Sequence, residues 1–171
     1  EVRVLHYQHG DLLTGGTSIE GQFENLIDLH ERELVCVTVA GRAIRNKPGI
    51  LAQLSSALAE ADINVQTVSS GMDSISFYID AKHAEEAETL LHDEVVDDTV
   101  LSSLTVEEGI AVIRVTGGDI QEQGGTVNAI LTPLAEEHVY LHDVITSATS
   151  LAIFVPWDDR ETALNIVQSV F

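Results

Sequence analysis

The hydrophobic pattern in the middle of the chain recurs at an offset of 76 residues, and the glycines between the apolar positions recur with it. The matched pairs include Gly41 and Gly117, Gly49 and Gly125, Leu58 and Leu134, and Phe77 and Ile153. Strand-like alternation, helical spacing and turn glycines are therefore preserved together. The sequence indicates two copies of one structural unit.

The first copy predicts the order β-α-β-β-α-β. Its strands are β-branched and apolar or alternate with period two, and its helices have apolar positions at helical spacing. This order is the ferredoxin-like arrangement, an α+β fold whose antiparallel four-stranded sheet carries both helices on one face. We expect Asn46 to cap the first helix and Pro48 to lie in its first turn. The predicted elements are the strand 34–40, the helix 50–61, the strands 63–70 and 75–79, the helix 81–92 and the strand 100–106.

The second copy lacks a fourth strand of its own, which would leave one sheet edge unpaired. The segment 23–29 alternates like a strand, and it precedes the first copy as 100–106 precedes the second. We therefore expect two modules, one at 34–107 and the other formed by 23–29 with 110–171. Pro133 falls in a predicted helix and is expected to kink or break it. The predicted elements are the strand 110–116, the helix 125–137, the strands 139–146 and 150–155 and the helix 158–170.

The charge balance is strongly acidic, with 28 acidic residues against 8 basic ones and a net charge of −20. Such a charge repels nucleic acid and anionic membranes, so neither is expected as a partner. Acids spread over well-patterned segments suggest a salt-rich cell interior, where repulsion is screened, as in a halophile. No apolar run reaches the roughly 18 residues of a membrane span. The single cysteine, Cys36, excludes an intrachain disulfide, and we expect a cytoplasmic protein.

Candidate catalytic and metal-binding groups are few. His138 and His142, which Asp143 follows, have spacing compatible with a metal site. The two histidines have no third convincing ligand, so no metal is expected. The glycine-rich stretches match no phosphate-binding fingerprint. The spacing of the residues also indicates no combination of a nucleophile with a general base. We expect no catalytic site in this chain. An enzyme built on a ferredoxin-like scaffold is the alternative of a different class, because the fold alone does not exclude it.

Three short motifs carry a resemblance to a known family. Asn-Lys-Pro-Gly-Ile at 46–50, Asp-Ile-Asn-Val at 62–65 and Ser-Ile-Ser-Phe at 74–77 resemble the first ACT module of aspartate kinases. In that family the regulatory region has two ACT modules, one inserted in the other, and residues 1–22 resemble the junction leaving the kinase domain. The resemblance implies allosteric feedback control of aspartate-family amino-acid biosynthesis. ATP and Mg²⁺ are then expected only in the kinase domain, which would act on aspartate. A free-standing tandem-ACT sensor or separate regulatory subunit is the alternative.

The resemblance also implies an effector site where ACT modules of neighbouring chains meet in a homo-oligomer. The effector in the family is lysine, threonine or both. The neutral Gln66 departs from lysine-specific relatives, and Ser70 replaces the glutamine of many threonine-responsive ones. Carried over by position, the first site comprises Asn46, Pro48, Gly49, Ile50, Asn64, Val65 and Ser70. A possible second site comprises Gly124, Gly125, Tyr140, Leu141, Thr146 and Ser147.

Overall fold

The computed structural model describes residues 2–4, 17–19, 25–42, 44–117, 125–147 and 149–171. Of the expected connecting segment 1–22 it thus describes only β1 and β2, which pair antiparallel with each other. The strands are β1 Val2–Val4, β2 Thr17–Ile19, β3 Leu26–Leu29, β4 Leu34–Gly41, β5 Val65–Ser70, β6 Ser74–Asp80, β7 Leu101–Thr116, β8 Asp143–Thr146 and β9 Ser150–Pro156. The helices are α1 Ile50–Glu60, α2 Ala84–Asp97, α3 Thr126–Glu136 and α4 Arg160–Val170, with short 3₁₀ turns at Ile44–Asn46, Ala81–His83 and Trp157–Asp159.

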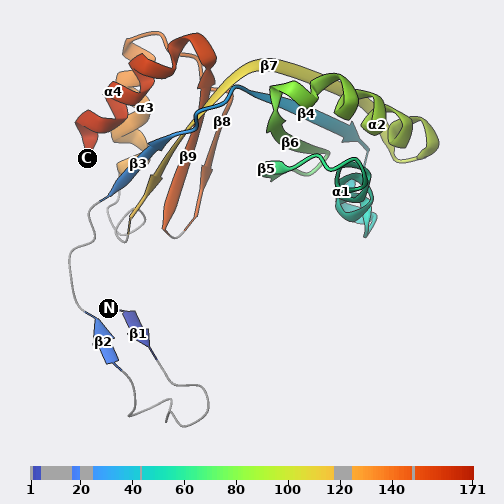
Figure 1. Ribbon diagram of the computed structural model, residues 1–171, viewed down its shortest axis with the longest axis horizontal. Helices are drawn as coiled ribbons and strands as arrows, with labels where there is room; N and C mark the ends of the chain where they lie inside the picture. The colour runs from blue at the N-terminus through green and yellow to red at the C-terminus, as the bar shows by residue number, and fades with distance from the viewer. Residues whose placement is uncertain (1, 5–16, 20–24, 43, 118–124, 148) are drawn as a thin grey trace.

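The strand β7 runs through both halves of the molecule, with α1 and α2 at one end and α3 and α4 at the other (Figure 1). The sheet order is β5-β6-β4-β7-β9-β8, and β3 also pairs with β7. The first half of β7 pairs with β4, whereas its second half pairs with β9 and β3. The predicted strands 100–106 and 110–116 are therefore one continuous strand, with Gly109 at a positive φ of 71° between them.

The internal repeat is reproduced in the strand register. Leu34 faces Asp80 where β4 pairs with β6. Adding 76 to both positions gives Ile110 and Pro156, which face each other where β7 pairs with β9. The other residues of these two ladders correspond in the same way. Two backbones of the same geometry thus follow each other along the chain, as the repeated hydrophobic pattern predicts.

The segment before the first copy lies in the sheet of the second. The strand β3 is antiparallel to β7, with Leu26 opposite Thr116 and Leu29 opposite Ile113. A side chain at Gly117 would collide with the side-chain oxygen of Asn25, just before β3. A side chain at the equivalent Gly41 would likewise collide with the backbone oxygen of Val100, just before β7. The repeated glycines therefore allow close approach at the same place in both copies.

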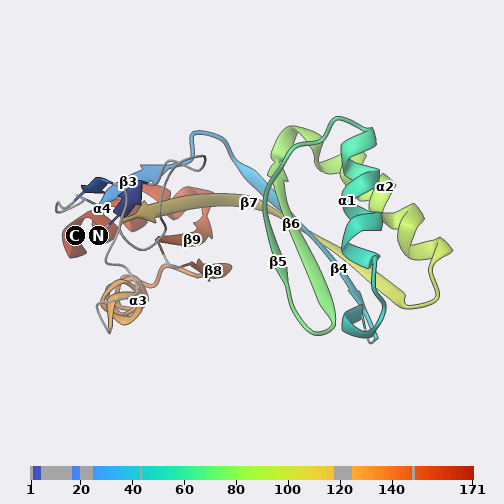
Figure 2. The ribbon, with the colours of Figure 1, turned by 90° about the horizontal axis from the view of Figure 1, so that it is seen from below.

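Two cores lie between helices and sheet, one in each half, because alternate residues of each strand face the helices. The first core is built around Val35, Val37, Leu54, Phe77 and Leu91, and the second around Ile113, Ile130, Leu134, Ile153 and Val167. Figure 2 shows the helix pairs α1–α2 and α3–α4 with their own parts of the sheet. This is the expected α+β, ferredoxin-like arrangement.

A third cluster occupies the opposite face of the strands and joins the two halves. It contains Leu34, Cys36, Tyr78, Ile110, Val112 and Phe154. The rings of Tyr78 and Phe154 are stacked with centroids 4.1 Å apart. The phenol of Tyr78 donates a hydrogen bond to Asp143 over 3.2 Å, and burial raises its pKa, so it stays protonated.

The segment that connects β3 to β4 is held by hydrogen bonds to both halves of the molecule. The backbone N–H of His30 donates to the Val112 carbonyl over 3.0 Å. Arg32 donates to the carboxylate of Asp80 over 2.7 Å. Asp80 is 8 % exposed and is the one buried charged residue among those that the structure describes. The connection is therefore tied to both halves.

Several local expectations were wrong. Asn46 ends a 3₁₀ turn, and Pro48 precedes α1, whose N-cap is Gly49. The strand expected at 139–146 begins only at Asp143, as β8. The helix α3 continues past Pro133 to Glu136, so the proline does not break it early. A proline near a helix end removes one donor, and the remaining turn still closes through the bond from the Glu137 N–H to the Pro133 carbonyl, 3.0 Å long. No helix in the described part of the chain is long and apolar enough to cross a membrane.

Candidate functional site

A surface pocket of about 270 Å³ lies at the start of α1, between the pre-helix loop and the end of β5. Its lining comprises Ile44, Arg45, Lys47, Gly49, Ile50, Leu51, Ser70, Gly71 and Ile75. Gly49, Ile50 and Ser70 were predicted site residues, so the structure brings three of the seven together. The floor is aliphatic and the rim is polar. Such a site suits a small molecule with one charged end.

The loop leaves backbone donors available at the start of α1. The Lys47 N–H closes the 3₁₀ turn onto the Ile44 carbonyl over 3.1 Å, and the Gln53 N–H makes the first bond of α1, to Gly49, over 2.9 Å. Gly49 has a φ of 96° and provides no side-chain cap. The first helical N–H groups, including those of Ile50 and Leu51, therefore have no partner within the helix. Together with the helix dipole they favour a carboxylate.

Two of the eight basic residues of this acidic chain line the pocket, and no carboxylate does so among its described residues. Arg45 extends over the exposed Met72, with its Nη1 3.1 Å from the methionine sulfur. The described lining therefore holds two basic side chains, of which Lys47 is paired with the carboxylate of Asp98 beside the pocket.

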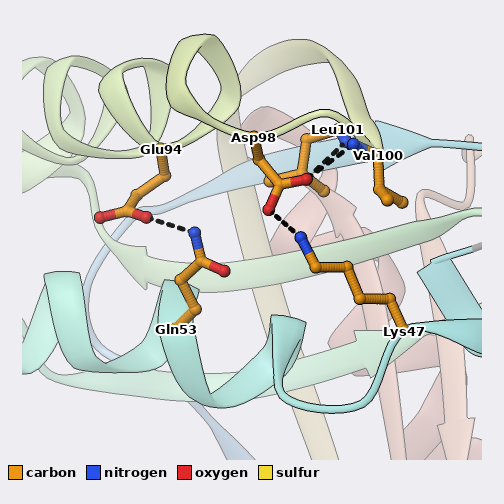
Figure 3. A network of polar contacts seen from close by, with 6 residues as sticks. All are labelled: Lys47, Gln53, Glu94, Asp98, Val100 and Leu101. Atoms are coloured by element: carbon orange, nitrogen blue, oxygen red, sulfur yellow. Dashed lines mark hydrogen bonds and ion pairs between the residues drawn. The ribbon is translucent and has the colours of Figure 1, made fainter.

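The loop is tethered to the segment between the end of α2 and the start of β7 (Figure 3). The Lys47 ammonium lies 2.5 Å from Oδ2 of Asp98. The other oxygen, Oδ1, accepts the N–H groups of Val100 and Leu101 over 2.7 and 3.4 Å. Lys47 and the Val100 N–H hold the pKa of Asp98 below its ordinary value. The carboxylate is thus ionised at neutral pH, and each of its two oxygens has a partner within the chain.

A second contact in Figure 3 holds the two helices of this module together. The Gln53 amide, in the first turn of α1, donates to Glu94 of α2 over 2.7 Å. Together with the Lys47–Asp98 pair, it fixes the start of α1 against the end of α2. The segment that forms the pocket is therefore held by a contact in the loop, Lys47 to Asp98, and by a contact in α1, Gln53 to Glu94.

The remaining residues predicted for the first site lie elsewhere. Asn46 and Pro48 are exposed in the loop and do not line the pocket. Asn64 and Val65 lie at the start of β5, and Ser70 lies at its end. Six residues of extended chain separate the two places by about 17–20 Å. Asn64 therefore does not reach the pocket of its own chain.

Sequence reasoning missed six lining residues, Ile44, Arg45, Lys47, Leu51, Gly71 and Ile75. One signal was available for two of them. Arg45 and Lys47 are close together in a chain with very few basic residues, just before a helix start. The aliphatic members carry no such signal, because their spacing is that of ordinary core positions.

The possible second site is less completely described. Gly124 lies outside the described residues, and Gly125 is the N-cap of α3 with a φ of 101°, matching Gly49. Tyr140 is 65 % exposed and contacts the edge of the His142 ring. Leu141 precedes β8, and Thr146 ends it. The hydroxyl of Ser147 is hydrogen-bonded to that of Ser150 over 2.6 Å, so it is already occupied.

Other chemistry-bearing residues do not form a reactive centre in the part of the chain that the structure describes. No three His, Cys, Asp or Glu side chains there are grouped so as to hold a metal ion. His142 faces Glu107 at 3.3 Å. Cys36 is 5 % exposed, and burial raises the pKa of its thiol. It is the small core residue that the sequence predicted, not a nucleophile.

Comparison with known proteins identifies both halves. The sequence profile of the ACT domain matches residues 37–95, and a second ACT-domain profile matches residues 105–169. An aspartokinase of Helicobacter pylori strain 26695 is 24 % identical over 138 residues, which cover 78 % of this chain and 33 % of that protein. The chain spans about a third of the length of the curated relatives it matches.

Two solved structures have the same fold. The ligand-free regulatory subunit of aspartate kinase from Thermus thermophilus has a TM-score of 0.71 and 21 % identity, covering 85 % of this chain and 95 % of that one. E. coli aspartokinase III, in complex with lysine and aspartate, has a TM-score of 0.68 and 21 % identity, covering 85 % of this chain and 32 % of that one.

Proposed function

Because the chain belongs to the ACT-domain family and carries two tandem ACT domains, we propose that it is the amino-acid-sensing regulatory region of an aspartate kinase. The support is the agreement in fold with a regulatory subunit over nearly its whole length. We propose the modules 34–107 and 23–29 with 110–171, and 1–22 as the connection to a kinase domain. ATP, Mg²⁺ and aspartate would then belong to that domain.

The observation that carries the effector site is the pocket at the start of α1, where the helix has no side-chain cap and where Arg45 and Lys47 line the wall. The α-carboxylate of an amino acid would accept the free N–H groups of α1, with Arg45 and Lys47 nearby. The hydroxyl of Ser70 and the strand-end carbonyls would accept the α-ammonium. A solved relative of this fold is a complex with lysine and aspartate, which supports an amino acid as the ligand class.

Asn64 would take part only from a second copy of the chain. It lies too far along β5 to reach its own pocket, and it is exposed. The pocket is also open to solvent, and a small unit has little concavity of its own to enclose a ligand. We therefore propose that the first modules of two chains associate, with Asn64 and Val65 of one chain beside the pocket of the other. Binding would shift the balance between two arrangements of the assembled protein.

Calorimetric titration of the chain with lysine, threonine and methionine tests the proposal. We expect saturable heat with at least one of them. Asn64→Ala should weaken that binding about ten- to hundredfold, since a hydrogen bond to a charged group contributes about 1.5–3 kcal/mol. Tyr140→Ala is the matched control in the second module and should bind with unchanged affinity. No heat with any of the three would remove amino-acid sensing from the account. Equal affinity in Asn64→Ala would remove the shared site.

A further inference from the structure

We propose that Met72 is a site of reversible oxidation, and that Arg45 holds the resulting sulfoxide so that the loop before α1 becomes fixed to the turn between β5 and β6. This is a modification site that acts on the loop itself. The inference does not depend on the proposed function, because the modified atom and its arginine partner both lie in the loop and the turn.

Met72 has the features of an oxidisable side chain. It lies in the turn between β5 and β6 and is 68 % exposed. It is the one methionine of the sequence. The other sulfur of the chain, that of Cys36, is 5 % exposed, and burial raises the pKa of its thiol. Because sulfur oxidation follows exposure and, for cysteine, thiolate character, a peroxide should react first at Met72.

The reaction needs a peroxide as its co-reactant. A lone pair of the thioether sulfur attacks one peroxide oxygen and the O–O bond breaks. The proton of the transferred oxygen moves to the departing oxygen, which leaves as water. The sulfur loses two electrons and the peroxide gains them. The product is a sulfoxide, which a methionine sulfoxide reductase returns to the thioether, so the step is reversible.

The guanidinium of Arg45 is already placed to receive the new oxygen. Its Nη1 lies 3.1 Å from the sulfur of Met72. A thioether sulfur is a weak hydrogen-bond acceptor. A charged donor makes a shorter and stronger bond to a polar oxygen, such as that of a sulfoxide. Oxidation should therefore turn a weak contact into a strong hydrogen bond.

Two cationic side chains tie the loop before α1 to the rest of the module, and they do so unequally. Lys47 is paired with the carboxylate of Asp98 over 2.5 Å (Figure 3). Arg45, two residues earlier, contacts the neutral sulfur of Met72. A stronger bond from Arg45 would therefore hold the loop on the side where its present contact is weak.

The turn that carries Met72 has a counterpart in the second module. The Gly71 N–H donates to the Ser74 carbonyl, and 76 residues later the Ser147 N–H donates to the Ser150 carbonyl, each over 2.8 Å. At the positions equivalent to the methionine and its arginine partner, the sequence has an alanine and a glutamine. The turn therefore closes without a methionine, and its second copy provides an internal control.

Mass spectrometry and amide hydrogen exchange test the inference on the full chain. With hydrogen peroxide, peptide mapping after dithiothreitol treatment should show one added oxygen, on Met72, at a rate within about tenfold of that of N-acetylmethionine amide. Exchange of the Lys47 and Gly71 amides, followed by NMR, should then slow by about two- to tenfold, the factor for one added hydrogen bond. Exchange of the Ser147 amide should not change. Treatment with a methionine sulfoxide reductase should restore the original rates.

Three variants assign the effect to the pair. In Arg45→Leu, which removes the donor and keeps an aliphatic side chain, Met72 should still be oxidised but exchange should not slow. In Met72→Leu, peroxide should leave exchange unchanged. Met72→Gln supplies an amide oxygen at a similar reach, so it should slow exchange without peroxide.

Three results would overturn the inference. Resistance of Met72 to peroxide would mean that its sulfur is shielded in solution. Oxidation with unchanged exchange of the Lys47 and Gly71 amides would mean that the sulfoxide does not fix the loop. Slowing that persists in Arg45→Leu would mean that Arg45 does not hold the sulfoxide. None of these results bears on the proposed function, which calorimetry tests separately.

Discussion

Phe154→Ala should test whether the third cluster holds the two modules together. The ring of Phe154 is fully buried and stacked on Tyr78 at 4.1 Å between centroids. It lies on β9, in the second module, whereas Tyr78 lies on β6, in the first. Removing the ring would leave a cavity in the third cluster and take the packing partner from Tyr78.

The expected cost is about 3–5 kcal/mol in the free energy of unfolding, the range for truncating a buried aromatic side chain. This is a large part of the roughly 5–15 kcal/mol that stabilises a typical domain. Equilibrium unfolding in urea, followed by circular dichroism, measures the change. We also expect a single transition to split into two, because each module keeps its own helix-facing core.

Val96→Ala is the control, since Val96 is 67 % exposed at the end of α2. An exposed truncation should change the free energy of unfolding by less than about 0.5 kcal/mol. A loss below about 1 kcal/mol in Phe154→Ala would refute the reasoning, because the ring would then contribute little more than a surface side chain.

Two further predictions concern charge. Lys47 lowers the pKa of Asp98 in the folded state, so its stabilisation is present above the ordinary carboxyl pKa of about 4 and is lost as pH falls through the folded-state value. Asp98→Asn should therefore reduce stability at pH 7 and flatten its dependence on pH in acid, as measured by melts between about pH 2 and 6; an unchanged pH dependence would contradict the pairing. The excess of acidic residues predicts a higher melting temperature in about 2 M than in about 0.1 M KCl, and coinciding melts would contradict adaptation to high salt.

The order of helices and strands could be predicted from the sequence because the same hydrophobic pattern occurs twice, so each copy supports the assignment of the other. Residues 34–40 were predicted as an apolar strand, and in β4 Val35 and Val37 belong to the first core, as Ala111 and Ile113 one repeat later belong to the second. The pairing of residues in 23–29 with the second copy followed from counting strands, since a ferredoxin-like sheet needs four. These features depend on local periodicity, which the sequence displays directly.

Features that depend on tertiary contact could not be predicted. The strand β7 is continuous where a break between two strands was expected, with Gly109 at a positive φ at that point. The third cluster combines Leu34, Tyr78 and Phe154 from distant segments, and each alone looks like an ordinary strand residue.

The site was predicted in part for a related reason. Gly49 was predicted as a site residue, and its φ of 96° gives it a separate conformational requirement. Added side-chain atoms there would meet nothing within 4 Å in this chain. Asn64 belongs to a separate motif, at 62–65, and lies just before β5, at the opposite end of this strand from Ser70. A motif records the order of residues along the chain and not which of them lie close together in the fold.

Mapping amino-acid binding onto the chain by NMR tests the central claim most directly. Titration of the isotope-labelled chain with whichever of lysine, threonine and methionine binds most tightly should shift the amide signals of residues 44–51 except Pro48, and those of Ser70 and Gly71, with one saturating curve. Signals from the outer face of α4, in the other module, should shift little. Unchanged spectra with saturating lysine, threonine and methionine alike, or shifts confined to residues 125–147, would contradict an amino-acid sensor built around the start of α1.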